Sequence, residues 1–557
     1  EFAFTLAGTV VISGIVALTL SPVLSANVLK PAGQEGRFEQ MAEQFFERLS
    51  NAYRRALSSV VQSLSVIVYF GVVVLIAIFL MVNFSKSELA PDEDQGILLY
   101  QGTGPQTANL DYLETYGEEM QERFEGLPGY EESFMLLGVN SPNTIFGGFK
   151  MKPINEREVS QFEVAPKLQE EMDKVTGMRV ATFPRPPLPA SGGGLPFQFV
   201  VTTGNDFEQL NQVAEELLSK ARASGNFIFI EKTIDYDRPI TRIKVDRDRV
   251  ADLGLSMADI GQTLSTMLGE GLVNRFNMSG RAYDVIPQVP REFRGEADRL
   301  SNYYVRADSG ELVSLDQVID FERGVEPSSR TQFNQLNAIT LQGVPMPGVA
   351  MGTAMEYMEG AASETLPSGF GFDYKGQTRQ LEKQGSALMV TFFLSLLVIY
   401  LVLAAQFESW RDPVIILVSV PLSVAGAMVF IVLGAASMNI YTQVGLITLI
   451  GVVAKNGILI VEFANLLQKD RGMGVREAAI EASAIRLRPI IMTSLALIVA
   501  MVPLLLASGP GAVSRFAIGL TVATGLGFGT FFTLFVLPGF YIMLARDHNA
   551  QAQGREA

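Results

Sequence analysis

Cysteine is absent from the 557 residues, and histidine occurs once, at His548 near the C-terminus. Without thiols the chain has no disulfide framework, no cysteine nucleophile and no cysteine-based metal site. A single histidine in a polar tail excludes histidine-dependent catalytic triads and histidine-ligated zinc within this chain. No Gly-Lys dipeptide occurs, so a Walker A phosphate loop is also excluded. The sequence therefore predicts neither a metal site nor a cofactor.

Charged residues are scarce, at 18% of the chain, against about 25% in soluble globular proteins. They are nearly missing from a set of long stretches, one of which is long enough for two membrane spans. Each span candidate reaches the length of about 20 apolar residues that a bilayer requires. The sequence thus predicts a polytopic α-helical membrane protein with seven spans. The stretches are 2–29, 56–85, 384–407, 413–454 (two spans), 489–514 and 516–545.

The charges that remain indicate the orientation. The acidic excess behind the net charge of −15 lies within residues 86–383, and the rest of the chain is slightly basic. Short loops rich in Lys and Arg stay in the cytoplasm, and segments 30–55 and 466–488 are of this kind, whereas the turns 434–442 and 507–514 carry no charge. We therefore expect the insert 86–383 and the N-terminal end outside the cytoplasm. This orientation favours a chain that is the C-terminal half of a longer polypeptide.

Hydrophobic length and charge also divide the membrane part into segments. Residues 1–29 and 59–85 are predicted as single spans, and residues 384–546 as a five-span bundle. Residues 30–58 contain an amphipathic helix, which lies along the cytoplasmic membrane surface or packs against a partner chain. Residues 547–557 form a cytoplasmic tail.

Strand and helix patterns alternate through the insert. This alternation predicts small α+β subdomains of the ferredoxin-like βαβ type, with helices on one face of each sheet. Segment 241–329 is richer in strand patterns and is expected to form a separate subdomain between 86–240 and 330–383. The loops 139–149 and 184–196 are rich in Gly, Pro, Asn and Ser. They are predicted as mobile connections over a cleft.

Lys455 lies inside a predicted span, with apolar residues on both sides. An ammonium at that depth costs several kcal/mol unless it is paired, so intramembrane lysines generally mark function. Glu462 is about 10 Å further along the helix axis and is too far to pair with it. We infer that its acidic partners lie outside this chain and that the pair exchanges protons. Thr493, Ser494 and Asn456 are expected as polar companions of Lys455 in neighbouring spans.

Four segments carry a family resemblance: Ala454–Ala464 (AKNGILIVEFA), Arg486–Ser494 (RLRPIIMTS), Pro91–Gly96 (PDEDQG) and Ala404–Trp410 (AAQFESW). These segments closely resemble motifs of the resistance-nodulation-division superfamily, in its branch of AcrB-type hydrophobe/amphiphile efflux pumps. The resemblance covers essentially the whole chain, as the C-terminal half of such a pump.

The resemblance implies a secondary active transporter rather than an enzyme. It implies a homotrimer in the inner membrane of a Gram-negative bacterium that works with a periplasmic adaptor protein and an outer-membrane channel, as a tripartite system. The transport expected is proton-driven efflux of amphiphilic or hydrophobic compounds. Lys455, Arg486 and Thr493 match the family's proton-relay positions, with Asn456 beside them. The relay's paired aspartates belong to a span of the N-terminal half, which this chain lacks.

The resemblance also divides the periplasmic insert. It implies porter subdomains at 86–240 and 330–383 and a funnel-like docking subdomain at 241–329, with 139–149 as a switch loop between substrate pockets. Aromatic side chains suit a promiscuous pocket because they offer apolar area with few directional demands. For each phenylalanine, ordinary core packing is the alternative. The residues implied for substrate binding are Phe197, Phe199, Val201, Phe134, Phe146 and Phe149.

Two other functions compete with efflux of amphiphiles. A heavy-metal exporter of the same superfamily would need soft ligands, and Met351, Met355 and Met358 do fall on one helical face. This spacing is also typical of core packing. A membrane-anchored periplasmic sensor or enzyme is the second alternative, although the cytoplasmic loops are short and no carboxylate pair suggests catalysis.

Overall fold

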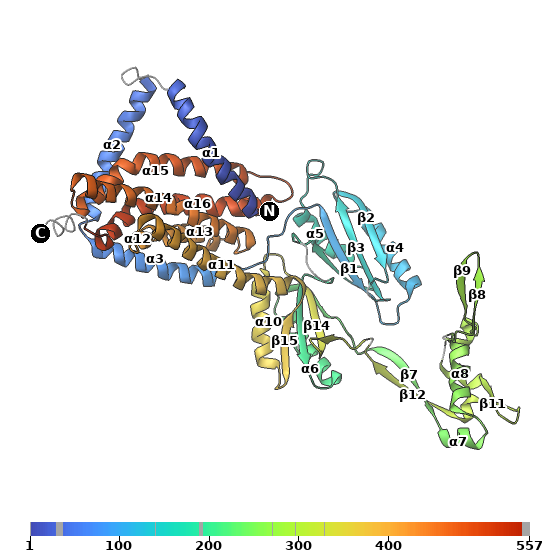
Figure 1. The fold of residues 1–557 in the computed structure, drawn as a ribbon. Helices are drawn as coiled ribbons and strands as arrows, with labels where there is room; N and C mark the ends of the chain where they lie inside the picture. The colour runs from blue at the N-terminus through green and yellow to red at the C-terminus, as the bar shows by residue number, and fades with distance from the viewer. Residues whose placement is uncertain are drawn as a thin grey trace. The chain divides into compact units, whose positions relative to one another are not determined.

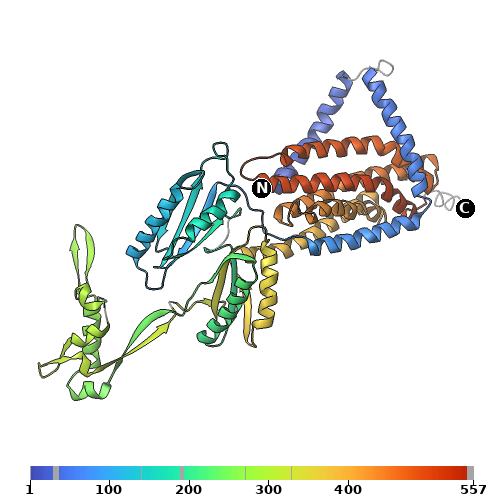
Figure 2. The ribbon, with the colours of Figure 1, turned by 180° about the vertical axis from the view of Figure 1, so that it is seen from behind.

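The computed structural model describes residues 2–28, 37–139, 141–188, 193–269, 271–295, 297–327 and 329–547. The chain forms two compact units. Residues 1–93 with 381–557 are called the membrane unit, and residues 94–380 the inserted unit. Figures 1 and 2 show their ribbons from opposite sides. Several predicted segments lie partly or wholly outside the described residues. They are the loop before the amphipathic helix, the loops 139–149 (at residue 140) and 184–196 (at 189–192), the segment 241–329 (at 270, 296 and 328) and the tail from His548 onward.

Seven helical segments among the described residues are long and apolar enough to cross a membrane. This confirms the predicted fold class of the membrane part. One span is divided between two consecutive helices, α12 and α13. The segments are α1 (Phe2–Val28), α3 (Leu64–Phe84), α11 (Gly376–Phe407), α12 (Asp412–Leu417) with α13 (Ser419–Val432), α14 (Ile440–Arg471), α15 (Val475–Leu505) and α16 (Ala512–Leu544).

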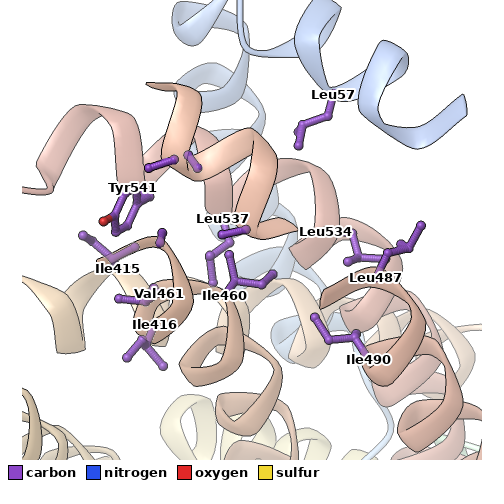
Figure 3. Close-up of a cluster of buried hydrophobic side chains, with 14 of the residues drawn as sticks. Leu57, Ile415, Ile416, Ile460, Val461, Leu487, Ile490, Leu534, Leu537 and Tyr541 are labelled. Atoms are coloured by element: carbon purple, nitrogen blue, oxygen red, sulfur yellow. The ribbon is translucent and has the colours of Figure 1, made fainter. Parts of the chain in front are cut away.

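Helix α16 is at the centre of the membrane unit, where it packs against α3, α13, α14 and α15. Both ribbon views show α14, α15 and α16 running side by side. Figure 3 shows the buried cluster between them, in which Ile460, Ile490 and Leu537 come from three different helices. A helix this apolar on all sides is stable only inside a bundle or in lipid.

The glycines of α16 allow the helices to approach closely. A Cβ at Gly529 would collide with the side chain of Ser423 in α13, and one at Gly525 with Leu449 in α14. At Gly527, by contrast, a Cβ would meet only Ile498, at an ordinary contact distance of 3.7 Å. Small residues at such positions are a general device of membrane helix packing.

The amphipathic helix α2 (Arg37–Val60) packs on the membrane unit through one face. Tyr53 and Leu57 are buried in the cluster of Figure 3, where Leu57 is labelled. Ser50 donates a hydrogen bond of 3.2 Å to the carbonyl of Ala484, and Arg54 forms an ion pair of 2.7 Å with Glu481. These contacts attach α2 to α15.

The first sheet of the inserted unit has the ferredoxin-like order β2-β3-β1-β4, with every pair antiparallel. Its helices α4 and α5 cover one face and enclose a core that includes Leu98, Tyr100 and Phe124. The elements are β1 (Ile97–Thr103), α4 (Leu110–Glu125), β2 (Tyr130–Leu137), β3 (Thr144–Met151), α5 (Gln161–Met172) and β4 (Arg179–Pro184).

The second sheet repeats this plan around its central strand β5, every residue of which is buried. Strand β14 pairs with β5 and β6, and β15 pairs with the other edge of β5. The predicted ferredoxin-like architecture is therefore confirmed. The elements are β5 (Phe197–Thr203), α6 (Phe207–Ala223), β6 (Phe227–Lys232), β13 (Gln332–Phe333), β14 (Leu336–Pro345), α10 (Met351–Thr365) and β15 (Phe370–Tyr374).

A third subdomain is inserted between β6 and β14. The strand pair β7 (Arg238–Val245) and β12 (Ile319–Glu326) leads into and out of it. Its small core gathers around Ile260 and Leu315. The remaining elements are α7 (Arg247–Asp252), α8 (Met257–Leu268), β8 (Asn274–Met278), β9 (Arg281–Val285), α9 (Arg291–Arg294), β10 (Tyr304–Arg306) and β11 (Leu312–Ser314).

The prediction of a loop over 139–149 is wrong for most of its length. Residues from Thr144 onward form β3, a central strand between β2 and β1. Gly147 and Gly148 suggested a turn, but they serve close packing. A Cβ at Gly147 would strike the Tyr100 ring, and one at Gly148 the Phe134 ring. Only the residues before Thr144 connect β2 to β3.

The boundary between the units also differs from the prediction at 85/86. Residues up to Glu93 belong to the membrane unit. Charge suggested the earlier boundary, because residues 86–94 include five ionisable side chains. Yet Glu93 is only 4% exposed, and its carboxylate is held by hydrogen bonds from Val513 and Ser514. Buried carboxylates with such partners are compatible with a packed position.

We predict that Gly529→Ala weakens the packing of α16 on α13. Overpacking of this kind typically costs about 1–3 kcal/mol, so the thermal midpoint of the purified protein in detergent is expected to fall. Gly527→Ala is the matched control on the same helix and should leave the midpoint nearly unchanged. Equal midpoints for the two variants would contradict the close approach at Gly529.

Candidate functional site

Lys455 lies in the middle of α14, on a face of the helix that is exposed in this chain. Gly451, Glu462 and Leu466 follow the same exposed face. Lys455 forms neither a hydrogen bond nor an ion pair with any residue that the structure describes.

The neighbouring side chain, Asn456, points into the helix bundle and is 3% exposed. Its Nδ2 donates hydrogen bonds to Ser494 Oγ of α15 at 3.2 Å and to Thr530 Oγ1 of α16 at 3.1 Å. Thr530 in turn donates to Ser494 Oγ at 3.0 Å. We call Asn456, Ser494 and Thr530 the amide–hydroxyl triad. It joins three spans at the depth of Lys455, because Asn456 is the next residue along α14.

The other two predicted relay residues are not part of this triad. Thr493 is half-buried, and its hydroxyl donates to the carbonyl of Ile490 in its own helix at 3.2 Å. Arg486 lies about 12 Å from Ser494 along α15. Its guanidinium stacks over the Phe463 ring at 4.4 Å, and its buried Nε has no hydrogen-bond partner among the described residues.

A second polar cluster lies toward the end of α14. The Tyr541 hydroxyl of α16 donates to Asn465 Oδ1 at 2.5 Å and accepts a hydrogen bond of 2.7 Å from Gln468. Asn465 also donates to Asp412 of α12 at 3.3 Å. Neither this cluster nor the role of Thr530 was predicted from the sequence. The available signal was the presence of amide and hydroxyl side chains within otherwise apolar spans.

The six predicted substrate residues lie on two kinds of sheet face, the helix-covered core face and the helix-free face. Phe149 is fully buried under the helices of the first sheet, where its ring packs against Phe124 and Tyr130. Strand alternation places its neighbours at even offsets on the same face. Phe146 and Phe134 lie on the opposite, helix-free face; Phe146 is half-buried and Phe134 is 49% exposed.

Phe197, Phe199 and Val201 share one face of β5 and are completely buried. Tyr374 lies opposite Phe199 in the neighbouring strand, so it is on that same face, and its hydroxyl bonds to Glu359 of α10. This face is therefore the one that the helices cover. In this structure the three side chains occupy core positions, so the structure does not bring the six predicted residues into one pocket.

The helix-free faces of the two sheets meet in a mixed apolar and polar contact. Phe183 and Leu99 of the first sheet pack with Val344 and Phe229 of the second. These residues were missed because alternation within one strand does not reveal which face a helix covers. Met355 and Met358, considered above as metal ligands, are buried on the inner side of α10, where packing explains them.

One buried charged residue, Glu231, lies between the two sheets. It is the one charged side chain there, among the described residues, with less than 5% of its surface exposed. It accepts hydrogen bonds from Gln342 Nε2 at 3.1 Å and from Thr103 Oγ1 of the other sheet at 3.3 Å. Burial raises the pKa of this carboxyl, and the guanidinium of Arg179, 3.7 Å away, opposes that rise. Its second oxygen, Oε2, accepts no hydrogen bond from a described residue.

Seven spans and an inserted unit of two ferredoxin-like subdomains define a polytopic helical membrane protein with a large α+β domain outside the spans. Residues 1–545 match the model of the AcrB/AcrD/AcrF family. The chain belongs to this family, and the resemblance inferred from its motifs is confirmed.

Individual relatives agree with this assignment. The chain is 38% identical to an uncharacterized transporter of Haemophilus influenzae, over 98% of this chain and 54% of the relative. It is 32% identical to the multidrug/solvent efflux pump membrane transporter MepB of Pseudomonas putida, over 98% and 53%. It is 31% identical to the multidrug export protein AcrF of Escherichia coli, over 98% and 54%. The chain thus spans about half the length of each relative.

We predict that Phe149→Ala and Phe134→Ala have very different effects on stability. Truncation of a fully buried phenylalanine costs about 3–5 kcal/mol, whereas truncation at the half-exposed Phe134 should cost within about 1 kcal/mol. Thermal melting of the two purified variants measures the difference. Similar losses of stability would contradict the assignment of these residues to opposite faces of the sheet.

Proposed function

We propose that this chain forms part of a proton-driven transporter that exports amphiphilic and hydrophobic compounds. The observation that carries the proposal is Lys455, an ammonium in the middle of an apolar span with no acidic partner among the described residues. Membership of the AcrB/AcrD/AcrF family and the efflux functions named for MepB and AcrF support it.

The physics of an intramembrane cation suggests the coupling step. An ammonium in hydrocarbon is costly unless a carboxylate neutralises it. We propose that paired aspartates outside residues 1–557 face Lys455 and bind the transported proton. Protonation of those carboxylates removes the attraction to Lys455, so the helices repack when a proton binds or leaves.

The amide–hydroxyl triad gives this repacking a route to other helices. Because Asn456 directly follows Lys455, a shift of α14 at Lys455 also moves a side chain that is bonded to α15 and α16. Arg486 and Thr493 are proposed as relay residues on α15. The buried Nε of Arg486 offers a hydrogen-bond donor that a proton-carrying water or carboxylate would use.

Substrate is proposed to bind against the helix-free faces of the two sheets. Phe134 and Phe146 would contact it directly, beside the packed contact in which Leu99, Phe183 and Phe229 join the two sheets. Apolar side chains with a few polar groups are the usual lining of a promiscuous pocket.

The remaining predicted substrate residues receive a different role. Phe149, Phe197, Phe199 and Val201 are proposed to shape the same sheets from their core sides, because all four are fully buried.

The assembly follows from the family. We propose a homotrimer in the inner membrane of a Gram-negative bacterium, with residues 94–380 in the periplasm, a periplasmic adaptor and an outer-membrane channel. Residues 241–329 would dock to these partners. Transport would be secondary active transport by proton antiport, without enzymatic chemistry.

We predict that Lys455→Met in the complete transporter abolishes drug resistance, because the charge that responds to the carboxylates is lost. Resistance should fall to that of cells without the transporter, at unchanged protein level in the membrane. Lys469→Ala, at the exposed end of the same helix, is the matched control and should leave resistance unchanged. Retained export with Lys455→Met would defeat the relay assignment.

We also predict that Phe134→Ala combined with Phe146→Ala shifts the range of exported compounds rather than ending transport. Resistance to a panel of amphiphilic dyes, detergents and antibiotics measures the shift. Phe162→Ala is the control, since this phenylalanine on α5 is 48% exposed and lies outside the helix-free face. A uniform loss for every compound would count against direct contact with substrate.

A further inference from the structure

The segment from Lys86 to Asp94 links α3 to β1 and carries a run of acidic residues. Its first half lies along the start of α14. The Glu88 amide donates to the carbonyl of Met438 at 3.1 Å, and the Met438 amide donates to the carbonyl of Lys86 at 2.8 Å. The Ile440 amide donates to Leu89 O at 3.2 Å. The segment is thus fixed by backbone hydrogen bonds to the N-terminus of the helix that carries Lys455.

Its second half is fixed to α16. The N-cap residue of this helix, Gly511, has no side chain that could accept from the first amides. Glu93 supplies the acceptor instead: its carboxylate accepts from the Val513 amide at 3.3 Å and from the Ser514 amide at 2.8 Å. The Ser514 hydroxyl donates to the same carboxylate at 2.5 Å. A carboxylate at this position is favoured both by the free amides and by the helix dipole.

The very next residue, Asp94, is fixed within the other unit. Its carboxylate accepts from the Gln161 amide at the start of α5 at 3.1 Å and pairs with Arg157, whose side chain is 2% exposed. Gln161 completes the attachment, since its Oε1 accepts from the amides of Gln95 at 3.1 Å and Ile97 at 3.2 Å. The consecutive carboxylates of Glu93 and Asp94 therefore accept hydrogen bonds within two different units, the membrane unit and the inserted unit.

The two helices fixed by this segment, α14 and α16, are among the three joined by the amide–hydroxyl triad. Thr530 lies about 24 Å along α16 from Ser514, and Asn456 lies about 26 Å along α14 from Asn439. Hydrogen-bonded helices transmit axial displacement over such lengths because they have few soft degrees of freedom. A displacement at the triad would thus reach Glu93, and through one peptide bond Asp94 and β1.

We propose that Glu93 is a positioning residue that couples movement of α16 to the first sheet of the inserted unit, with Asp94 as its counterpart on that sheet. This inference rests on the proposed function, because it assigns the route between the proton relay and the substrate-binding sheets. It predicts that loss of the Glu93 contacts slows transport without altering substrate binding.

The test uses the complete transporter in proteoliposomes with an imposed proton gradient. Glu93→Ala is expected to lower the maximal export rate about tenfold, with KM unchanged, because the coupling contact is lost while the substrate-binding sheets are unaltered. Glu93→Gln, which keeps an acceptor oxygen, should stay within about twofold of the original rate. Asp206→Ala is the control, because the Asp206 carboxylate caps α6, accepting from the Phe207 amide at 2.9 Å, far from this segment in sequence.

A second variant covers the case in which Glu93→Ala fails to fold. Because residues 1–557 contain no cysteine, Glu93→Cys with Ser514→Cys introduces the only two thiols of this part, and any cysteine elsewhere in the transporter is first replaced by serine. A short bis-methanethiosulfonate reagent can then join the two thiols reversibly. Export should be near the original rate when they are joined and should fall severalfold after reduction in the same sample.

An unchanged rate in Glu93→Ala, or an equal loss of rate and melting temperature in Glu93→Ala and Asp206→Ala, would overturn the inference. So would a rate that does not respond to reduction of the cross-linked variant. Failure of the proposed function would look different: the unaltered transporter would show no proton-dependent export, or Lys455→Met would retain it.

Discussion

A charge inside an apolar span needs a partner, and this requirement organises the membrane unit. The polar side chains on two faces of helix α14 differ in whether they have a partner. Asn456 has both of its donor bonds inside the chain, whereas the adjacent Lys455 has no partner among the described residues. One helix thus carries a satisfied polar group bonded to its neighbours and an unsatisfied cation one residue away. Anything that neutralises the cation acts directly on a helix that is hydrogen-bonded to two others.

Helix α16 takes part in the close helix packing, in the triad and in the contact with Glu93. Its glycines allow close contact with α13 and α14, its Thr530 belongs to the triad, and its first turn is capped by Glu93. The dense packing around this helix leaves few voids that could absorb a local shift. In the inserted unit, strand alternation separates the helix-covered core face of each sheet from its helix-free face. The helix-free face carries Phe134 in the first sheet and Glu231 in the second.

Sequence reasoning failed where one signal had two physical causes. Gly147 and Gly148 resemble a turn, yet they are needed where Tyr100 and Phe134 lie against the backbone of β3. The acidic residues before Asp94 suggested a solvated boundary, yet Glu93 is buried because it caps a helix more than four hundred positions away in sequence. The family resemblance implied that Phe197 and Phe199 line a pocket, and they are buried in this structure. Aromatic residues suit both a core and a binding surface, so their type alone does not distinguish the two roles.

The spans, the α+β insert, the intramembrane lysine and the family were accessible from the sequence, because hydrophobic length, charge distribution and motif spacing are properties of single segments. The tertiary structure alone decided which face of each strand the helices cover, which hydroxyls meet Asn456, and which helix end receives Glu93. These contacts join residues separated by 36 to 421 positions. Periodicity fixes the direction of a side chain relative to its own element, and only packing fixes what that side chain meets.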